Sequence, residues 1–315
     1  MSEKIKILIT GGFGALGHNL IKKLHTDSNN EIHVIDNLSA GTANFSKSVT
    51  FTHLDIGNTE KISAFFKNYK PNYIYHLAAH FANQNSVDHP ISDVSTNVIG
   101  IINLFETQKG NKELQKIVYM SSSCVYGNSE IMSETVNVNP YDTPYAINKY
   151  VGELYCKYYS EIHNIPSVCI RIFNNYGPGE MPGPYRNVIP NFIQKALQNE
   201  DIIITGTGDE TRDFTYVDDT INLITKLASS KYQMAELFNG GTGIKITIKF
   251  LAETIIELTK SNSTIIYVAP REWDHVTDRC SDITKSSKMI GYKPESEFRD
   301  GLIKAILWIK DKMKE

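Results

Sequence analysis

The sequence predicts an α/β protein in which a doubly wound parallel sheet is followed by a smaller mixed α/β domain. Through the first half of the 315 residues, short runs rich in Ile and Val alternate with longer segments of helical period. A glycine-rich turn follows the first run, and a Pro- and Gly-rich loop near residue 177 ends the alternation. Strands and helices in alternation require right-handed crossovers, which cover both faces of a parallel sheet with helices.

The expected strands show little regular polar alternation, which is typical of strands that are buried on both faces. They cover about residues 4–10, 31–36, 49–54, 72–77, 115–121 and 166–173. Helices are expected between them at about 14–27, 58–69, 88–108 and 143–163. Beyond the loop we expect an amphipathic helix at about 188–199, short strands, and helices near 217–229, 247–260 and 299–313.

The composition is that of an ordinary globular protein, with 41% hydrophobic residues, 21% charged residues and a formal net charge of −3. This balance gives no electrostatic reason to expect a nucleic-acid or membrane partner. Cys124, Cys156, Cys169 and Cys280 lie far apart, so neither a zinc site nor a disulfide framework is expected. Because there is no basic leader or long apolar segment, we expect a cytoplasmic protein.

A glycine-rich turn, TGGFGALG over residues 10–17, comes directly after the first expected strand. Its glycines would permit a tight turn, close approach of a pyrophosphate and close packing of the following helix, whose N-terminus attracts the anion. Asp36 ends the second strand, where a carboxylate suits the ribose hydroxyls of NAD and repels the phosphate of NADP. The pattern predicts a Rossmann-type NAD site; the alternative is a structural turn with a capping aspartate.

Tyr145 and Lys149 lie four residues apart in an expected helix, so they share one face of it. A tyrosine with an ordinary pKa of about 10 is a poor base at neutral pH. A lysine cation and a nicotinamide beside it would favour the phenolate, which makes the pair suitable as a catalytic base. The alternative is an exposed Tyr and Lys on a helix surface, since this spacing also arises by chance.

Together these motifs resemble the extended short-chain dehydrogenase/reductases, and among them the NAD-dependent nucleotide-sugar epimerase/dehydratase family. The resemblance covers nearly the whole chain. It extends to HLAA at 76–79, SSSCVYG at 121–127, RIFNNYGP at 171–178, GTG at 206–208 and RDFTYVDD at 212–219, and to Asn97, Gly100, Arg271 and Asp274. It implies an NAD-binding Rossmann domain over residues 1–175, with a returning segment near 213–240, and a nucleotide-sugar-binding domain over 176–315.

The resemblance also implies a role for each matching residue. Ser122 would bond the sugar C4 hydroxyl, Tyr145 would act as the base and Lys149 would hold the nicotinamide ribose. NAD would contact Gly11, Phe13, Gly14, Ala15, Leu16, Gly17, Asp36, Asn37, Asp55, Ile56, Leu77, Ala78, Ala79, Tyr145 and Lys149. The substrate would contact Ser122, Ser123, His80, Asn174, Asn187, Arg212 and Arg271, with the arginines on its phosphates.

Several of these residues also have plain structural interpretations. Arg212 and Arg271 could instead form surface salt bridges with Asp209, Asp213 or Asp274. His76 has no second ligand at metal spacing, so we expect a packed strand-end histidine and no metal site.

The implied reaction begins with oxidation at C4, because Tyr145 can take the hydroxyl proton while hydride passes to NAD. Dehydratases of the family add an Asp-Glu pair after the Ser/Thr, and decarboxylating members also need an acid there. This chain has Ser123 and Cys124 instead. A 4-epimerase that acts through a 4-keto sugar is therefore expected. The alternatives are an oxidoreductase that stops at the ketone and, after it, a non-catalytic NAD-binding regulator.

A homodimer is expected from the resemblance and from apolar residues in the helices near 88–108 and 143–163. Paired across a two-fold axis, these helices would form a four-helix bundle. The apolar residues are Ile101, Leu104, Phe105, Leu154 and Tyr158.

Overall fold

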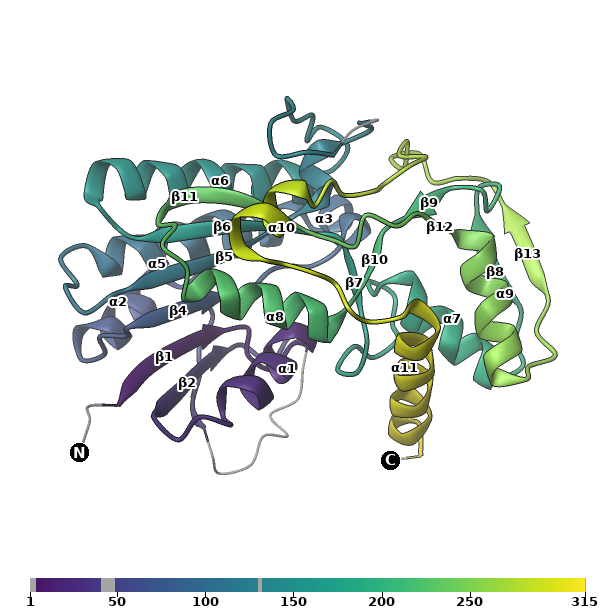
Figure 1. Ribbon diagram of the computed structural model, residues 1–315, viewed down its shortest axis with the longest axis horizontal. Helices are drawn as coiled ribbons and strands as arrows, with labels where there is room; N and C mark the ends of the chain where they lie inside the picture. Colours follow the sequence, from purple (N-terminus) through teal and green to yellow (C-terminus); the bar gives the residue numbers. More distant parts are fainter. Residues whose placement is uncertain (1–3, 41–48, 130–131, 315) are drawn as a thin grey trace. The chain divides into compact units, whose positions relative to one another are not determined.

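The computed structural model describes residues 4–40, 49–129 and 132–314. Its main sheet consists of β1 Ile5–Thr10, β2 Asn30–Asp36, β3 Thr50–His53, β4 Tyr73–His76, β5 Lys116–Ser122, β6 Ser167–Ile172 and β11 Met234–Gly240. The seven strands have the order β11-β6-β5-β4-β1-β2-β3 (Figure 1). β1 pairs in parallel with β2 and β4, β2 with β3, and β4 with β5. This order confirms the predicted doubly wound fold class.

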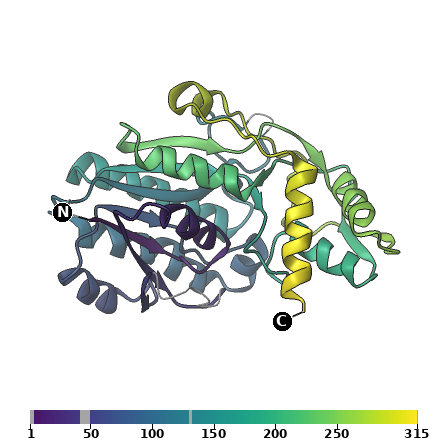
Figure 2. The ribbon, with the colours of Figure 1, turned by 60° about the horizontal axis from the view of Figure 1, so that its bottom comes forward.

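Helices cover both faces of this sheet, as right-handed crossovers require (Figures 1 and 2). They are α1 Ala15–Leu24, α2 Thr59–Lys67, α5 Gly100–Gln108, α6 Pro144–His163 and α8 Val217–Ala228. The first six strands end within one residue of their predicted bounds. β11 was missed because its first half is exposed or half-buried and carries a glutamate, so no apolar run marks it.

The helix predicted at 88–108 is present and continues without a break from Pro90 to Gln108, as α4 Pro90–Val94, the π-helix η1 Ser95–Ile99 and α5. A short helix, α3 Asn83–Asp88, comes before it. His89 leaves the helical conformation between α3 and α4, and Pro90, which lacks an N–H donor, starts the second piece. The wider turn of η1 then shifts the side chains that follow it around the helix axis.

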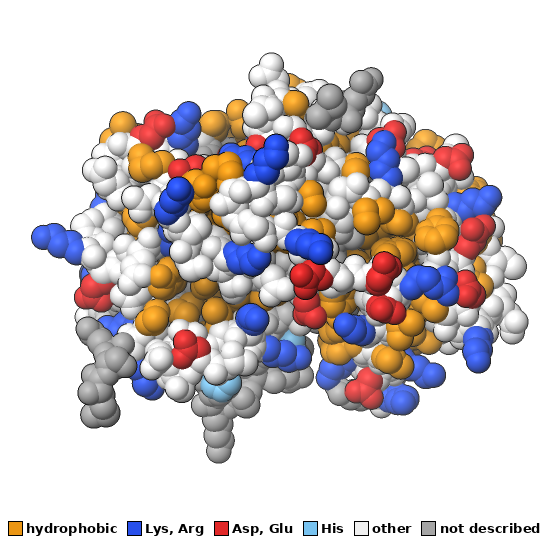
Figure 3. Space-filling view, in the orientation of Figure 1, with side chains coloured by type: hydrophobic (Ala, Val, Ile, Leu, Met, Phe, Trp, Pro, Cys, Tyr) orange, Lys and Arg blue, Asp and Glu red, His pale blue; other side chains and the backbone are white. Residues whose placement is uncertain are grey.

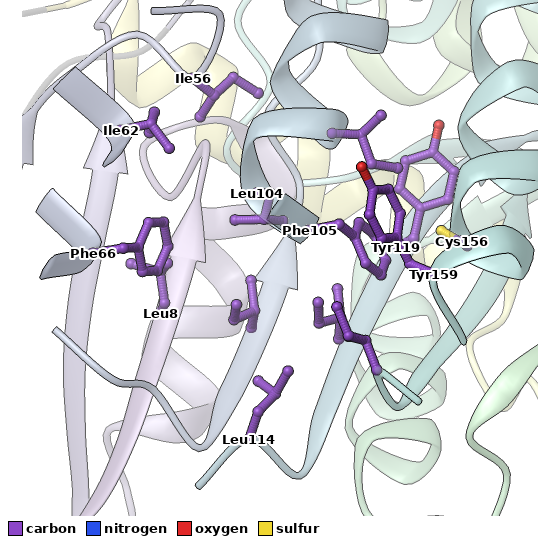
Figure 4. Packing of buried hydrophobic residues seen from close by; sticks show 14 of the residues in the cluster. Leu8, Ile56, Ile62, Phe66, Leu104, Phe105, Leu114, Tyr119, Cys156 and Tyr159 are labelled. Atoms are coloured by element: carbon purple, nitrogen blue, oxygen red, sulfur yellow. The ribbon is translucent and has the colours of Figure 1, made fainter. Parts of the chain in front are cut away.

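One face of the sheet carries a hydrophobic core that is shared with α2, α5 and α6 (Figure 4). Phe105 of α5 stacks on Tyr159 of α6 with ring centroids 4.9 Å apart. Ile101, Leu104 and Phe105 are all fully buried in this core, so their predicted place at a dimer interface is wrong. The reason is that α5 packs between α2 and α6 and has no free apolar face.

The contacts within the chain divide it into two compact units. The first comprises Met1–Ser122, Pro144–Arg171 and Ile221–Phe238, and the second comprises Ser123–Thr143, Ile172–Thr220 and Asn239–Glu315. Because the chain passes repeatedly from one unit to the other, the units are not two successive halves. The assignment of NAD to one domain and the nucleotide-sugar to the other stays a prediction.

The second unit is mixed α/β and contains three two-stranded sheets. Its elements are η2 Ser123–Tyr126, β7 Asn174–Tyr176, α7 Val188–Leu197, β8 Ile202–Thr205, β9 Thr211–Arg212, β10 Phe214–Tyr216, β12 Ile246–Thr247, α9 Ile248–Thr259, β13 Ile265–Val268, α10 Thr284–Ile290 and α11 Phe298–Lys312. β7 pairs with β10 and β8 with β13 in parallel, whereas β9 and β12 are antiparallel. The helices α7, α9 and α11 pack on one another.

Within the described ranges, no helix has the length and apolar composition needed to cross a bilayer. The same residues contain no cluster of His, Cys, Asp and Glu that could hold a metal ion. On the face drawn in Figure 3, Lys and Arg are interspersed with Asp and Glu rather than gathered in one basic patch.

Candidate functional site

The glycine-rich turn lies where the chain leaves β1, directly against the segment that follows β4. Gly11 has a φ of +69°, and a Cβ placed on it would lie 2.6 Å from the backbone nitrogen of Ala78. A Cβ on Gly17 would lie 2.5 Å from Gly12 Cα, because α1 presses on the loop. Among the residues that the structure describes, a Cβ on Gly14 would come within 4 Å of Gly11 O alone, at 3.4 Å. The glycines thus leave the backbone of the loop uncovered, as binding of a pyrophosphate requires.

The helix that follows the loop starts without a capping side chain. Gly14 is the N-cap of α1, has extended backbone and, as a glycine, has no side chain that could cap the helix. Ala15 and Leu16 form the first turn. The free N–H groups and the positive end of the helix dipole suit a bound phosphate.

Asp36 ends β2 and is tied to the glycine loop by its side chain. Its Oδ2 accepts a hydrogen bond from the Phe13 N–H at 2.9 Å, and its Oδ1 accepts one from the Leu38 N–H at 2.8 Å. Each carboxylate oxygen keeps a further lone pair after these bonds. The carboxylate is thus held in one orientation and can still accept bonds from a ribose diol.

The other predicted cofactor residues gather at the same ends of the strands. The Asn37 side chain donates to Asp55 Oδ2 at 2.8 Å, which joins the residues that follow β2 to those that follow β3. Ile56 is buried, and its carbonyl accepts a bond from Asn103 Nδ2 at 2.9 Å. The Leu77 N–H donates to Thr10 O at 3.1 Å, so Leu77, Ala78 and Ala79 leave β4 beside the glycine loop.

Tyr145 and Lys149 share one face of α6, and both are buried, with 5% and 4% of their surface exposed. Lys149 Nζ donates to Met120 O at 2.9 Å and lies 5.7 Å from the centroid of the Tyr145 ring. Met120 is two residues before Ser122, which ends β5 and is also buried. The alternative of an exposed surface pair is therefore excluded.

His76 is a packed neutral histidine, as the sequence analysis expected. It lies at the end of β4, where its Nδ1 and Thr10 Oγ1 are 2.7 Å apart. Burial and, after it, the Lys149 cation lower the pKa of His76 to about 3. His76 therefore places no second positive charge beside Lys149.

A buried polar network that the sequence analysis did not assign lies beside this pair. Asp93 accepts bonds from Asn148 Nδ2 at 2.6 Å and from Asn97 Nδ2 at 2.9 Å. Asn97 also accepts from the His80 N–H at 3.2 Å and donates to the His80 carbonyl at 3.1 Å. The network joins the segment after β4 to α6, between Tyr145 and Lys149. Asn97, which matches the family pattern, is the sequence signal for this network.

In the second unit, Arg212 lies on β9 and is largely buried. Its Nη2 is 3.5 Å from Asp274 Oδ1, and its Nη1 donates to Thr211 O at 2.9 Å. Burial and the neighbouring Arg279 cation lower the pKa of Arg212. Arg212 thus forms an ion pair with Asp274, one of the partners considered as an alternative, but the pair is partly buried and not at the surface.

The other predicted substrate residues have different surroundings. Asn174 Nδ2 donates to Asp213 O at 3.4 Å, which places Asn174 next to the Arg212 segment. Asn187 is the N-cap of α7, and its N–H and Nδ2 donate to the buried Glu180 at 3.2 and 3.3 Å. Burial raises the pKa of Glu180.

Arg271 is exposed and stacks over the Trp273 ring at 5.6 Å, with no ion pair in the described part of the chain. Ser123 is buried in η2. The structure therefore places Asn174 beside the Arg212 segment, and Asn187 Nδ2 also donates to Asn175 O at 3.4 Å. Arg271 instead stacks on Trp273.

The geometry of Asp36 makes its contribution to cofactor choice testable. We expect NAD to bind more tightly than NADP, because the fixed carboxylate would face a 2′-phosphate of like charge. Asp36→Asn should weaken NAD binding about tenfold, through loss of a charged hydrogen-bond acceptor, and reduce the discrimination against NADP. Titration calorimetry measures both dissociation constants. Asp27→Asn, in the exposed turn before β2, is the matched control, and equal affinity of the unaltered protein for the two cofactors would contradict the assignment.

Comparison with known proteins gives a consistent result. Residues 7–240 match the sequence model of the NAD dependent epimerase/dehydratase family. The putative UDP-glucose 4-epimerase of Methanocaldococcus jannaschii is 34% identical over 97% of this chain and 98% of its own. The UDP-N-acetyl-alpha-D-glucosaminuronate decarboxylase of Bacillus cytotoxicus is 30% identical over 98% of each chain.

A solved structure agrees with these relatives. The UDP-glucuronic acid 4-epimerase of Bacillus cereus, in complex with UDP-glucuronic acid and NAD, superposes with a TM-score of 0.89. It is 28% identical, and the match covers 98% of this chain and 100% of that one. The predicted family is thereby confirmed: the chain belongs to the NAD dependent epimerase/dehydratase family of enzymes, and its cofactor is NAD.

Proposed function

We propose that this protein is a 4-epimerase of nucleotide-linked sugars that works through a 4-keto intermediate. The observation that carries the proposal is the buried pair of Tyr145 and Lys149 on α6, with the Lys149 ammonium fixed on Met120 O. Relatives and solved neighbours that act on UDP-glucose and UDP-glucuronic acid as 4-epimerases support it.

The chain's own residues supply the proton chemistry. NAD, held by the glycine loop and Asp36, would supply the hydride chemistry at C4. Tyr145 takes the proton of the C4 hydroxyl, and Ser122 bonds the same oxygen. The Lys149 cation favours the phenolate form of Tyr145. The neighbouring His76 is neutral, so it adds no second positive charge beside Lys149. Returning the hydride to the opposite face of the ketone inverts C4.

The residues after Ser122 oppose loss of water from the intermediate. Elimination across C5 and C6 needs one group to remove the C5 proton and another to protonate the leaving hydroxyl. The two available positions hold Ser123, a buried serine, and Cys124. Serine is no acid, and a thiol with an ordinary pKa of about 8.5 is a weak substitute for a carboxylate. The product should therefore retain its C6 oxygen.

The epimerase proposal is tested by incubating the NAD-loaded enzyme with UDP-glucose, UDP-glucuronic acid and their N-acetylated and C4-inverted forms. We expect inversion at C4 without loss of mass and without net NADH. Product stereochemistry by NMR, mass spectrometry and absorbance at the NADH band give the three readouts. A product lighter by one water would overturn the argument from Ser123 and Cys124, and accumulating NADH would indicate an oxidoreductase.

The roles of Tyr145 and Lys149 predict different defects. Tyr145→Phe should lower kcat by about 100-fold to 10,000-fold while NAD affinity stays unchanged, because only the proton acceptor is lost. Lys149→Ala should lower both kcat and NAD affinity. Tyr155→Phe, on the same helix, is the matched control and should keep full activity. Near-normal turnover by Tyr145→Phe would refute the mechanism.

A homodimer belongs to the proposal, with Leu154 and Tyr158 of the residues first predicted but without the buried Ile101, Leu104 and Phe105. The exposed apolar residues on this side of the first unit are Val87, Ile91, Val94 and Ile99 from the α3–η1 segment and Ile147, Leu154, Tyr158 and Ile162 from α6. Their spacing of mostly three, four and seven residues marks one stripe on each helix. Two such stripes from each copy would form a four-helix interface.

Leu154→Glu should break this dimer, because it places a charge in the centre of the apolar stripe. We expect the dissociation constant of the dimer to rise at least about 100-fold, so that light scattering at micromolar concentration reports a monomer. Leu307→Glu changes a comparably exposed leucine of α11 and should leave the dimer intact. A monomeric unaltered protein would contradict the assembly itself.

A further inference from the structure

A buried ion pair lies on α6 one helical turn after the candidate catalytic residues. Glu153 is four residues after Lys149 and eight after Tyr145, so the three side chains lie along one stripe of the helix. Arg171 of β6 bonds both carboxylate oxygens of Glu153, from Nε to Oε1 at 2.9 Å and from Nη2 to Oε2 at 2.7 Å. The side chains of Glu153 and Arg171 are only 9% and 3% exposed. All four residues belong to the first unit.

The carboxylate of Glu153 ties α6 to the end of β5. Ser121 Oγ donates to Glu153 Oε1 at 2.5 Å, and the next residue is Ser122, which is proposed to bond the sugar C4 oxygen. The bond from Lys149 Nζ to Met120 O joins the same end of β5 to α6 one turn earlier. Glu153 therefore holds the end of β5 in a fixed place relative to Lys149.

A carboxylate in this place also brings a negative charge that opposes the action of Lys149. The helical rise of about 1.5 Å per residue puts Glu153 roughly 12 Å from Tyr145 along the axis. With an effective dielectric constant of about 20, an uncompensated charge at that distance moves a titration by roughly one pH unit. The guanidinium of Arg171 cancels this charge and also satisfies the carboxylate with two hydrogen bonds.

Other charged groups around α6 do not replace Arg171 in this role. Asp93 of α4 is fully buried and adds a second negative charge, and its oxygens accept bonds from two asparagine side chains. Lys116 lies at the opposite end of β5, where its Nζ donates to Ser230 O. The remaining groups on α6 and on the helices that contact it are exposed or half-buried, so solvent screens them. They are His80, Asp88, His89, Glu106, Lys109, Lys157, Glu161 and His163.

Three buried titratable groups beside the ion pair are neutral. Burial raises the pKa values of Tyr119 and Cys156 well above their ordinary ranges. Burial also lowers the pKa of His76 to about 3. These side chains therefore neither add to the charge of Lys149 nor oppose it.

We propose that Arg171 keeps Tyr145 effective as a base at neutral pH by cancelling the charge of Glu153, whose carboxylate holds the end of β5 on α6. Arg171 and Glu153 are positioning residues, because they act through Lys149, Ser121 and Tyr145. The inference rests on the proposed function, since it takes Tyr145 to be the base.

The test is a pH titration of Tyr145 in NAD-loaded protein. The ultraviolet absorbance of tyrosinate is recorded for each variant with and without Tyr145→Phe, and the difference gives the titration of Tyr145 alone. Glu153→Gln leaves the Arg171 cation uncompensated, which favours the phenolate, so we expect the titration to move about 0.5 to 1 pH unit lower. Arg171→Gln leaves the carboxylate uncompensated and should move the titration by a similar amount to higher pH.

Further variants separate the effect of charge from that of structure. Glu153→Gln/Arg171→Gln removes both charges and should titrate like the unaltered protein. Arg171→Lys keeps the positive charge and should also leave the titration in place. Lys157→Gln removes an exposed cation four residues after Glu153 on the same helix and is the matched control. The urea midpoint reports folding, and Glu153→Gln with the double variant carries the test if Arg171→Gln unfolds.

Shifts of Glu153→Gln and Arg171→Gln in the same direction would overturn the proposal, as would an unmoved titration in Glu153→Gln. In either case the ion pair is a structural link alone. The pH at which kcat/KM for the nucleotide-sugar rises should move together with the titration. If the unaltered protein inverts C4 but the variants leave the titration of Tyr145 unmoved, this inference alone fails. If no nucleotide-sugar is turned over, the proposed function fails.

Discussion

The candidate cofactor site depends on how closely the backbone after β1 approaches the backbone after β4. These two strands are neighbours at the point where the order of the sheet reverses, so their connections leave in opposite directions and open a crevice. At Gly11 even a methyl group would collide with Ala78, because the two backbones are almost in contact. The bond from the Phe13 N–H to Asp36 then joins β2 to the same loop. One steric constraint therefore gathers residues from three strands.

A second close approach positions the catalytic pair. A Cβ on Gly152 would collide with the Tyr119 hydroxyl, so the glycine at this position allows α6 to pack closely against β5. That proximity lets Lys149 reach the carbonyl of Met120 in the neighbouring strand. One residue before Lys149, Asn148 donates to Asp93. Polar bonds to β5 and to α4 therefore anchor the turn of α6 that follows Tyr145.

The sequence predicted what depends on local patterns. The first six strands were predicted from apolar runs and the glycine loop from the spacing of its glycines, because both features depend only on residues that are close together in the sequence. The π-helix η1 was missed, because hydrogen bonds between residues five apart do not change the spacing of apolar residues in the sequence. The apolar periods of α5 and α6 could not show that Phe105 faces its own core whereas Leu154 faces outward. Asp93 and Arg279 were missed because only the tertiary fold buries them.

The distribution of carboxylates explains why positive charge persists in the second unit. Asp213 follows Arg212 directly and is fully buried, yet it bonds to Thr242, Gly243 and Ser281 and to neither arginine. Ser281 is two residues after Arg279, so the same carboxylate anchors the segments that carry both cations. Its acceptor capacity is taken up by backbone N–H groups and hydroxyls. Asp213 can therefore fix the positions of Arg212 and Arg279 without pairing with either of them.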